Sequence, residues 1–281
     1  MSGTCCLICT FLLGGFSISH AQNPGVFNEP DSLYAIKQYD EALLAFERIH
    51  YFNDENFIKI EALFKKAECL KQLKRFNDAE RCLNRIDLTE LPDSVSFKIR
   101  YQAALNAYLG SHFPDAESYL TQLFFYTTDS NLTNKALPLF ALVLNELQKW
   151  NEAKEKLIQY KSNDSLTTAL TALYNPKNIP KLKNLEKATL LSTLIPGSGQ
   201  MYAGYFWEGL GNATLQVVCL GFTGVAIWQK YYVSSLFVGY STFFRFYQGG
   251  VVRTEYLVNK KNYELTRKYN DTLKTEILKV M

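Results

Sequence analysis

The chain has 281 residues, 47% of them hydrophobic, and a formal net charge of +3 at pH 7. This length suggests about two domains, and so small a charge, without a Lys/Arg run, argues against a nucleic-acid partner. Residues 30–185 are rich in Lys, Glu, Asp and Asn, whereas residues 188–252 carry three charges, on Glu208, Lys230 and Arg245. This change in composition predicts a domain boundary.

Residues 1–21 have the pattern of a secretory signal peptide. The stretch from Cys5 to Ser19 is mostly apolar and uncharged, and Ser19-His20-Ala21 resembles a small-x-small cleavage site. No Lys or Arg precedes this stretch, so an uncleaved anchor and a misassigned start codon stay open.

Cleavage would leave three cysteines, Cys69, Cys82 and Cys219. Their odd number and the absence of a CxxC spacing among them argue against a metal site or a disulfide framework. Cys69 and Cys82 are expected on neighbouring helices of one hairpin. A disulfide there is one alternative, and two buried apolar thiols are the other.

Residues 22–165 contain a repeat with a period of 37 residues. An aromatic residue opens each copy, an acid and an alanine follow two and three positions later, and a large apolar residue stands four positions after the alanine. A further small residue precedes the last three aromatics by nine positions. The sets are Tyr39, Phe76, Phe113 and Trp150; Ala42, Ala79, Ala116 and Ala153; Phe46, Leu83, Leu120 and Leu157; and Ala67, Ala104 and Ala141.

Spacings of three and four place these residues on one face of a helix, and the acid in the first turn complements the helix dipole. The pattern predicts second helices of about 14 residues, within the ordinary range. It also predicts a short first helix starting near a cap-like Asp31. Because one hairpin cannot bury its own apolar face, the copies must stack into a short solenoid.

Segments such as Arg75-Phe76-Asn77-Asp78-Ala79-Glu80 resemble the turn and second helix of tetratricopeptide repeats, over roughly residues 30–165. The period of 37 departs from the usual ~34, and the closing proline of each repeat is missing apart from a nearby Pro92. The resemblance implies a scaffold that binds a protein or peptide. His50 and His112 sit in no ligand spacing, and no catalytic, metal or cofactor motif is present, so neither an enzyme nor a cofactor is expected.

Residues 166–187 form a Lys- and Asn-rich linker, and residues 188–252 hold three apolar stretches. The stretch Ala188–Trp207 is broken by Pro196-Gly197-Ser198-Gly199, which favours an amphipathic or re-entrant segment over a kinked span. The stretches Gly209–Trp228 and Tyr231–Val252 are long enough to span a bilayer, and aromatic residues stand at their ends.

The segment Ile195–Tyr205 resembles a PGxGQxYxG signature that precedes a hairpin in uncharacterised, TM2-like bacterial membrane domains, which are often fused to tetratricopeptide repeats. The resemblance implies a location and an architecture, but no activity. A tight structural turn and a ligand or lipid site are the two interpretations of this segment, and Gln200 and Tyr202 are candidates to satisfy its freed carbonyls. The candidate site residues here are Pro196, Gly197, Gly199, Gln200, Tyr202, Gly204 and Arg245.

Arg245 lies about eight residues from the end of a predicted span, so a functional site and snorkelling to the interface both stay open. Residues 253–281 have the spacing of an amphipathic helix and are basic. A cleaved signal and two spans return this tail to the side of the repeats, whereas its charge favours the cytoplasm. We expect two spans, with three as the alternative.

These patterns predict an all-α protein: a tetratricopeptide-like helical-hairpin solenoid followed by a small transmembrane domain. The expected function is a protein-interaction scaffold at the bacterial inner membrane, with its repeats outside the cytoplasm. Its expected partners are an unidentified protein and the lipid bilayer, and a homo-oligomer is also possible on small-residue membrane faces. The alternative function is an accessory subunit for lipid or small-molecule transport, with a polar site at the membrane hairpin.

Overall fold

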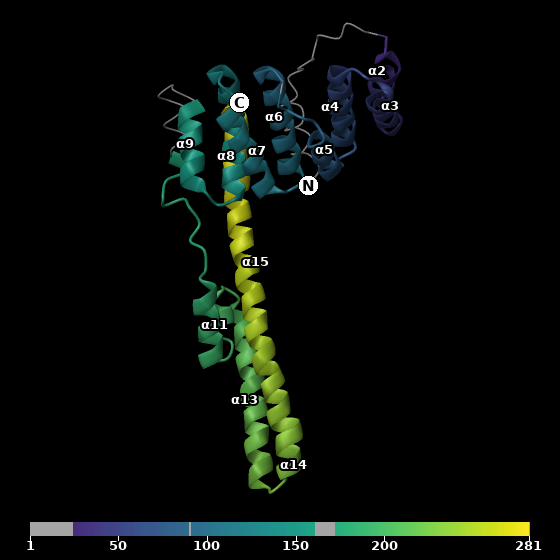
Figure 1. Ribbon diagram of the computed structural model, residues 1–281. Coiled ribbons are helices and arrows are strands. Elements are labelled where there is room, and N and C mark those ends of the chain that lie inside the picture. The colour runs from purple at the N-terminus through teal and green to yellow at the C-terminus, as the bar shows by residue number, and fades with distance from the viewer. Residues whose placement is uncertain (1–24, 90, 161–171, 281) are drawn as a thin grey trace. The chain divides into compact units, whose positions relative to one another are not determined.

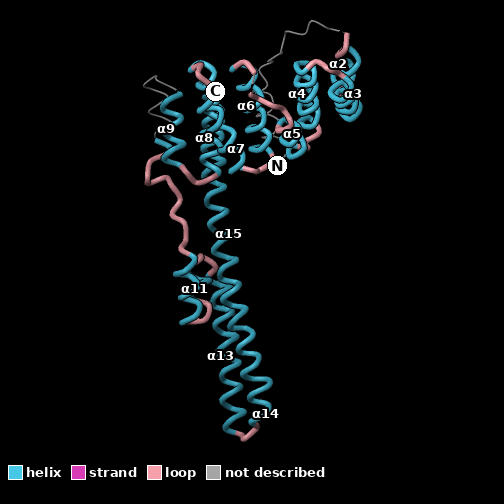
Figure 2. Tube along the Cα trace, in the orientation of Figure 1, coloured by secondary structure: helices cyan, strands magenta, loops and turns pink. Residues whose placement is uncertain are grey.

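The computed structural model describes residues 25–89, 91–160 and 172–280, so the predicted signal peptide, 1–21, lies outside it. Every regular element in these ranges is a helix, as Figure 2 shows. The chain divides into two compact units, residues 1–175 with 273–281, and residues 176–272. The boundary at Asn175 falls within the predicted linker 166–187.

The first unit consists of consecutive antiparallel helix pairs that follow one another in Figure 1. This order confirms the helix-hairpin part of the prediction. The pairs are α2 (Asn28–Ala35) with α3 (Tyr39–Phe52), α4 (Asn56–Gln72) with α5 (Phe76–Leu83), α6 (Asp93–Leu109) with α7 (Phe113–Tyr126), and α8 (Ser130–Glu146) with α9 (Trp150–Tyr160).

The turns between paired helices recur every 37 residues and have the same backbone geometry in each copy. Each repeat aromatic is the first residue of its second helix. Two positions earlier the backbone adopts a left-handed conformation in a residue other than glycine, with φ of 59° to 66°. The next main-chain N–H then donates to the carbonyl five residues back, which closes a Schellman turn. The left-handed residues are Lys37, Lys74, Ser111 and Gln148.

Small residues bring the paired helices together, and large residues fill the core around them. Ala42, Ala79, Ala116 and Ala153 are fully buried, as are Ala104 and Ala141. The apolar residues four positions after the first set are at most 3% exposed. The four aromatics Tyr39, Phe76, Phe113 and Trp150 are all half-buried at the helix starts. In every copy the alanine and the large apolar residue of the predicted packing face are buried, and the aromatic is half-buried.

Two details of the repeat unit differ from the sequence prediction. The helix α5 has 8 residues rather than about 14, because two tight turns follow Cys82 and Leu83 before Pro92 sets the start of α6. The first helix begins at Asn28 and places Asp31 inside its first turn. Asp31 is therefore no cap; its carboxylate lies 2.7 Å from the ammonium of Lys65.

The second unit contains α11 (Leu185–Leu194), α12 (Ser198–Tyr202), α13 (Phe206–Trp228), α14 (Tyr232–Ser234), the π-helix η1 (Ser235–Tyr240) and most of α15 (Ser241–Val280). The break predicted at Pro196–Gly199 separates α11 from α12, and both are too short to cross a bilayer. Among the described residues one helix, Phe206–Trp228, is long and apolar enough to do so. The predicted stretch 231–252 is divided among α14, η1 and α15.

Helix α13 packs against η1 and α15 through small residues, in antiparallel register. A Cβ at Gly239 would overlap the Thr223 hydroxyl, and one at Gly250 would overlap the Asn212 amide. The later glycine thus meets the earlier residue of α13, as expected for antiparallel helices. Large apolar side chains instead point outward: Trp207 and Trp228, near the two ends of α13, are 79% and 84% exposed.

The predicted amphipathic tail, residues 253–281, is helical but is not a separate element. It continues α15 without interruption to Val280. The last residues, from Leu273, belong to the repeat unit, where Leu273 and Ile277 are buried and Lys274 lies over the ring of Tyr108. The four-residue spacing that predicted an amphipathic helix thus includes positions that are buried in the repeat unit, at Leu273 and Ile277.

Candidate functional site

The repeat register defines an equivalent pair of residues wherever one hairpin meets the next. One member directly precedes the aromatic that opens a second helix, and the other directly follows the buried alanine of the previous hairpin. At the third junction this pair is Lys149 and Glu117, which form an ion pair of 2.5 Å. At the second junction His112 Nδ1 lies 3.3 Å from Glu80 Oε2.

The first junction breaks this rule, because Leu43 stands where the other two have a glutamate. Arg75, the cation of this junction, pairs instead with Asp78 of its own helix at 2.8 Å. A cavity of about 290 Å³ opens here between α3, α4 and α5. It is lined by Leu43, Lys66, Leu70, Arg75, Asp78, Arg81, Cys82 and Arg85.

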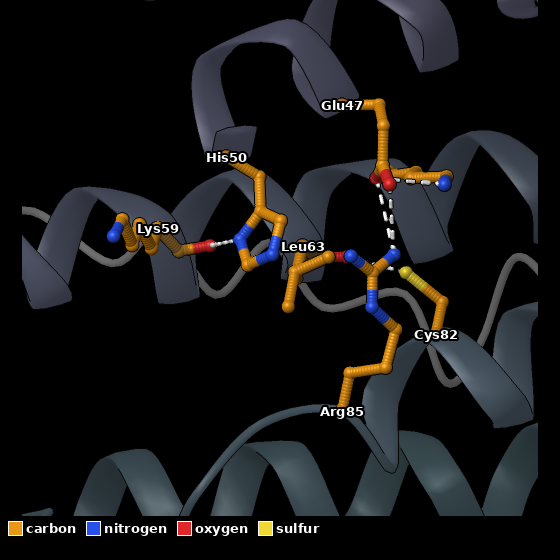
Figure 3. A network of polar contacts seen from close by, with 7 residues as sticks. Glu47, His50, Lys59, Leu63, Cys82 and Arg85 are labelled. Carbon is orange, nitrogen blue, oxygen red and sulfur yellow. Dashed lines mark hydrogen bonds and ion pairs between the residues drawn. The ribbon is translucent and has the colours of Figure 1, made fainter. Parts of the chain in front are cut away.

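Glu47 orders two of the cations that line this first-junction pocket. Its carboxylate accepts from Lys66 Nζ at 2.8 Å and from Arg85 Nη1 at 2.9 Å. Partial burial opposes ionisation of Glu47, but the hydrogen bonds from Lys66 and Arg85 outweigh it and lower its pKa. Figure 3 shows the Glu47 carboxylate facing the Arg85 guanidinium, with the His50 imidazole directed at the main-chain carbonyl of Lys59.

The pocket keeps an excess of positive charge after its internal pairs are formed. Four cations face two carboxylates, Glu47 and Asp78. Arg81 is exposed and makes no hydrogen bond or ion pair with any described residue. Its guanidinium can donate two parallel hydrogen bonds to a carboxylate or phosphate, which is the bidentate geometry that arginine favours. Leu43, Leu70 and Cys82 supply an apolar wall beside that charge.

Burial disfavours the thiolate form of the cysteine in the pocket. Burial raises the pKa of Cys82 to about 11 and that of Cys69 to about 12, so both are protonated at neutral pH. Both cysteines are free, and Cys82 Sγ donates to the carbonyl of Leu63 at 3.4 Å. They lie on the two helices of one hairpin, as predicted, and behave there as small buried residues.

The predicted motif in the second unit forms a compact turn around Gly197, whose φ is 86°. A Cβ on Gly197 would overlap the main chain of Gly209, and one on Gly199 would overlap the carbonyl of Ala188. Gly204, with φ of 97°, ends α12 in a Schellman turn. Pro196 is half-buried at the start of this turn.

The polar residues of the motif act differently from the prediction. The Ser198 hydroxyl lies 2.7 Å from the main-chain carbonyl oxygens of Leu191 and Ile195 and can donate to either at the end of α11. Gln200 reaches across to α15 and donates to the Gly250 carbonyl at 3.3 Å. Tyr202 accepts from the main-chain N–H of Asn184 at 3.3 Å. The motif thus fastens α11, α12 and α15 together.

Arg245 does not join this cluster. It is exposed and has no hydrogen bond or ion pair with a described residue. The ion pair of this unit instead joins Arg253 Nη2 to Glu208 Oε2 at 3.0 Å. Sequence reasoning missed it, because 45 residues separate the two partners.

Among protein-family models, curated proteins and solved structures, no match to the chain is found. The pocket cations were likewise not singled out from the sequence. One signal could have indicated them: Leu43 interrupts the series of acids formed by Glu80 and Glu117 in the repeat alignment. Arg75 is paired with Asp78 at this junction, and Arg81 is the pocket cation that has no partner among the described residues.

Proposed function

We propose that the chain is a membrane-anchored protein-interaction scaffold of the bacterial cell envelope, whose tetratricopeptide-like hairpins bind an acidic segment of a partner protein. The observation that carries the proposal is the first-junction pocket, with its surplus positive charge and apolar wall. An acidic side chain next to an aliphatic one matches both features. Electrostatic complementarity of this kind sets partner choice and association rate.

The exposed apolar surface of the second unit supports the membrane anchor. Helix α13 has 23 residues, about 35 Å at 1.5 Å per residue, against a hydrocarbon thickness of about 30 Å. Only 11% of its most apolar window is buried. A soluble protein rarely exposes so continuous an apolar face. We take α14, η1 and the start of α15 as the second span, and residues 1–21 as the signal that exports the repeats.

The anchor is tested by fractionation and by topology. The full-length chain is expected to sediment with membranes at high speed and to need detergent for release. Reporter fusions after Lys161 and after Met281 are expected on the same, non-cytoplasmic side. Recovery of the intact chain in the detergent-free supernatant would contradict the anchor. Reporters on opposite sides would contradict two spans and favour three or one.

Partner binding is tested by charge reversal at Arg81, because this change breaks no ion pair among the residues that the structure describes. Arg81→Glu is expected to weaken binding of the partner captured from detergent extract roughly tenfold in Kd. Arg48→Glu is the matched control: Arg48 is exposed on α3 and does not line the pocket. Equal binding by parent, Arg81→Glu and Arg48→Glu would contradict the pocket as the binding site.

A second candidate function is transport of a lipid or small molecule through a polar site in the second unit. Buried polar side chains in that unit favour it: the Oε1 atoms of Gln200 and Gln216 are buried without a hydrogen-bond partner among the described residues. Arg245 would then provide a charge for the ligand. An Arg245→Leu variant that equals the parent in lipid binding and growth would count against this alternative.

A further inference from the structure

The second junction brings three metal-binding side chains together, which the spacing of histidines in the sequence did not indicate. One ligand atom from each of Glu80, His112 and Asp115 lies within 4.8 Å of the other two. Glu80 comes from α5, whereas His112 and Asp115 come from the turn and first residues of α7. We propose that this site binds a divalent transition-metal ion of the zinc class and thereby links the second hairpin to the third.

The separation between His112 and Glu80 matches that of two ligands on a tetrahedral ion. Two ligands that are each about 2.1 Å from a zinc ion lie about 3.4 Å apart. His112 Nδ1 and Glu80 Oε2 are already 3.3 Å apart. Asp115 supplies the third ligand three residues after His112, and a water molecule would complete the tetrahedron. An imidazole with two carboxylates suits zinc and its first-row neighbours better than calcium or magnesium, which prefer oxygen alone.

Residues behind the ligands hold the central carboxylate in place. Tyr119 donates its hydroxyl to Glu80 Oε1 at 3.0 Å, which leaves Oε2 directed at His112. Asn84 in turn donates to the Tyr119 hydroxyl at 2.6 Å. Glu80 is only 8% exposed, so its orientation is fixed by packing as well as by these bonds. Such outer partners are a regular part of metal sites because they orient the ligands.

The third junction is an internal control for this proposal. Lys149 occupies the position of His112 there, and its ammonium forms a plain ion pair with Glu117. An ammonium offers no lone pair, so that junction cannot bind a metal through this position. A His112→Lys variant therefore converts the second junction to the form of the third. It is expected to retain an attraction to Glu80 while losing the metal.

The test uses the full chain, purified in detergent without a histidine tag, stripped with a chelator and titrated with zinc at micromolar concentration. The parent is expected to bind one more zinc equivalent than His112→Lys, and to gain thermal stability with zinc but not with magnesium. Asp115→Asn is expected to bind at least tenfold more weakly. His50→Gln, which removes a histidine outside the site, is expected to bind as the parent does.

Two results would overturn the proposal. One is zinc binding by His112→Lys and Asp115→Asn that equals the parent's, with both variants folded by circular dichroism. The other is an X-ray absorption spectrum in which the extra zinc has sulfur neighbours, because the proposed site offers only nitrogen and oxygen. Neither result would bear on the pocket at the first junction, whose test is binding of the protein partner to Arg81→Glu.

Discussion

The two units pack their helices in opposite ways. In the repeat unit small alanines bring helices together and large residues such as Phe46 and Leu120 are buried around them. In the second unit glycines such as Gly197, Gly199 and Gly239 lie at close helix contacts, while many large apolar residues of α13 and of the start of α15 are exposed. The burial pattern of a sequence therefore depends on the surroundings for which the fold was selected. This contrast is what an aqueous unit joined to a lipid-facing one would display.

The largest expected effect is on a buried leucine of the repeats. Leu120→Ala should destabilise the repeat unit by roughly 2–5 kcal/mol, because Leu120 is fully buried and its loss leaves a cavity. The matched change Leu220→Ala removes a side chain that is 50% exposed on α13, and should cost much less in detergent. Thermal unfolding followed by circular dichroism measures both. Similar losses from the two variants would break the comparison between units.

The next effect is on a glycine of the second unit. Gly209→Ala should destabilise the packing of α12 against α13 by about 1–3 kcal/mol, because its Cβ would overlap the Gly197 carbonyl, which is main chain and cannot swing away. Gly211→Ala, two residues on, meets open space and is the control. Protease resistance in detergent distinguishes them, and an equally resistant Gly209→Ala would show that close approach there is unnecessary.

A smaller effect concerns charge, which the repeat unit uses at its first junction. The lowered pKa of Glu47 adds stability that is present above its ordinary value of 4.5 and is lost as pH falls through the native value. Glu47→Gln should therefore be less stable than the parent at neutral pH, by about 1 kcal/mol or less since the pair is partly exposed. The difference should vanish in acid. Unfolding midpoints measured across this range test it, and a constant difference would exclude the carboxylate as its cause.

The smallest effect tests a feature that both units share. Lys74 and Lys230 each hold a positive φ at a Schellman turn, with values of 59° and 64°. Glycine adopts this conformation without strain but has more freedom to lose on folding. Lys74→Gly and Lys230→Gly should each stabilise the protein by at most about 1 kcal/mol. A difference in sign between the two, measured by thermal unfolding, would show that the turns are not equivalent.

The sequence predicted those features of the fold that recur at a fixed spacing. Tyr39, Phe76, Phe113 and Trp150 locate the start of each second helix because one turn is repeated with one chain length. The break at Pro196 was equally visible, since proline and glycine act locally. Contacts between distant elements were not predictable in this way. Glu80 meets His112 across 32 residues, and the same separation joins Glu117 to Lys149, but the aromatic and alanine pattern alone did not show that these side chains pair.

The pocket was missed for a related reason. In the sequence its cations look like ordinary surface residues. Only the alignment of Leu43 with the acids of the other junctions indicates that they surround a pocket. The shortness of α5 and the π-helix η1 were also outside the reach of periodicity. Both depend on how a particular segment meets its neighbours, whereas periodicity reports only which face of a helix is buried.

At the second and third junctions a basic side chain faces a glutamate, whereas at the first junction Leu43 stands in place of the acid. Removing the 37 residues 93–129 would bring Lys149 opposite Glu80, a pairing of opposite charges like the one it has now. Removing residues 56–92 would instead set His112 opposite Leu43, which is not an acid. The first shortened array would keep a basic side chain opposite a glutamate at its new junction, whereas the second would repeat the form of the present first junction, in which Leu43 stands opposite a basic residue.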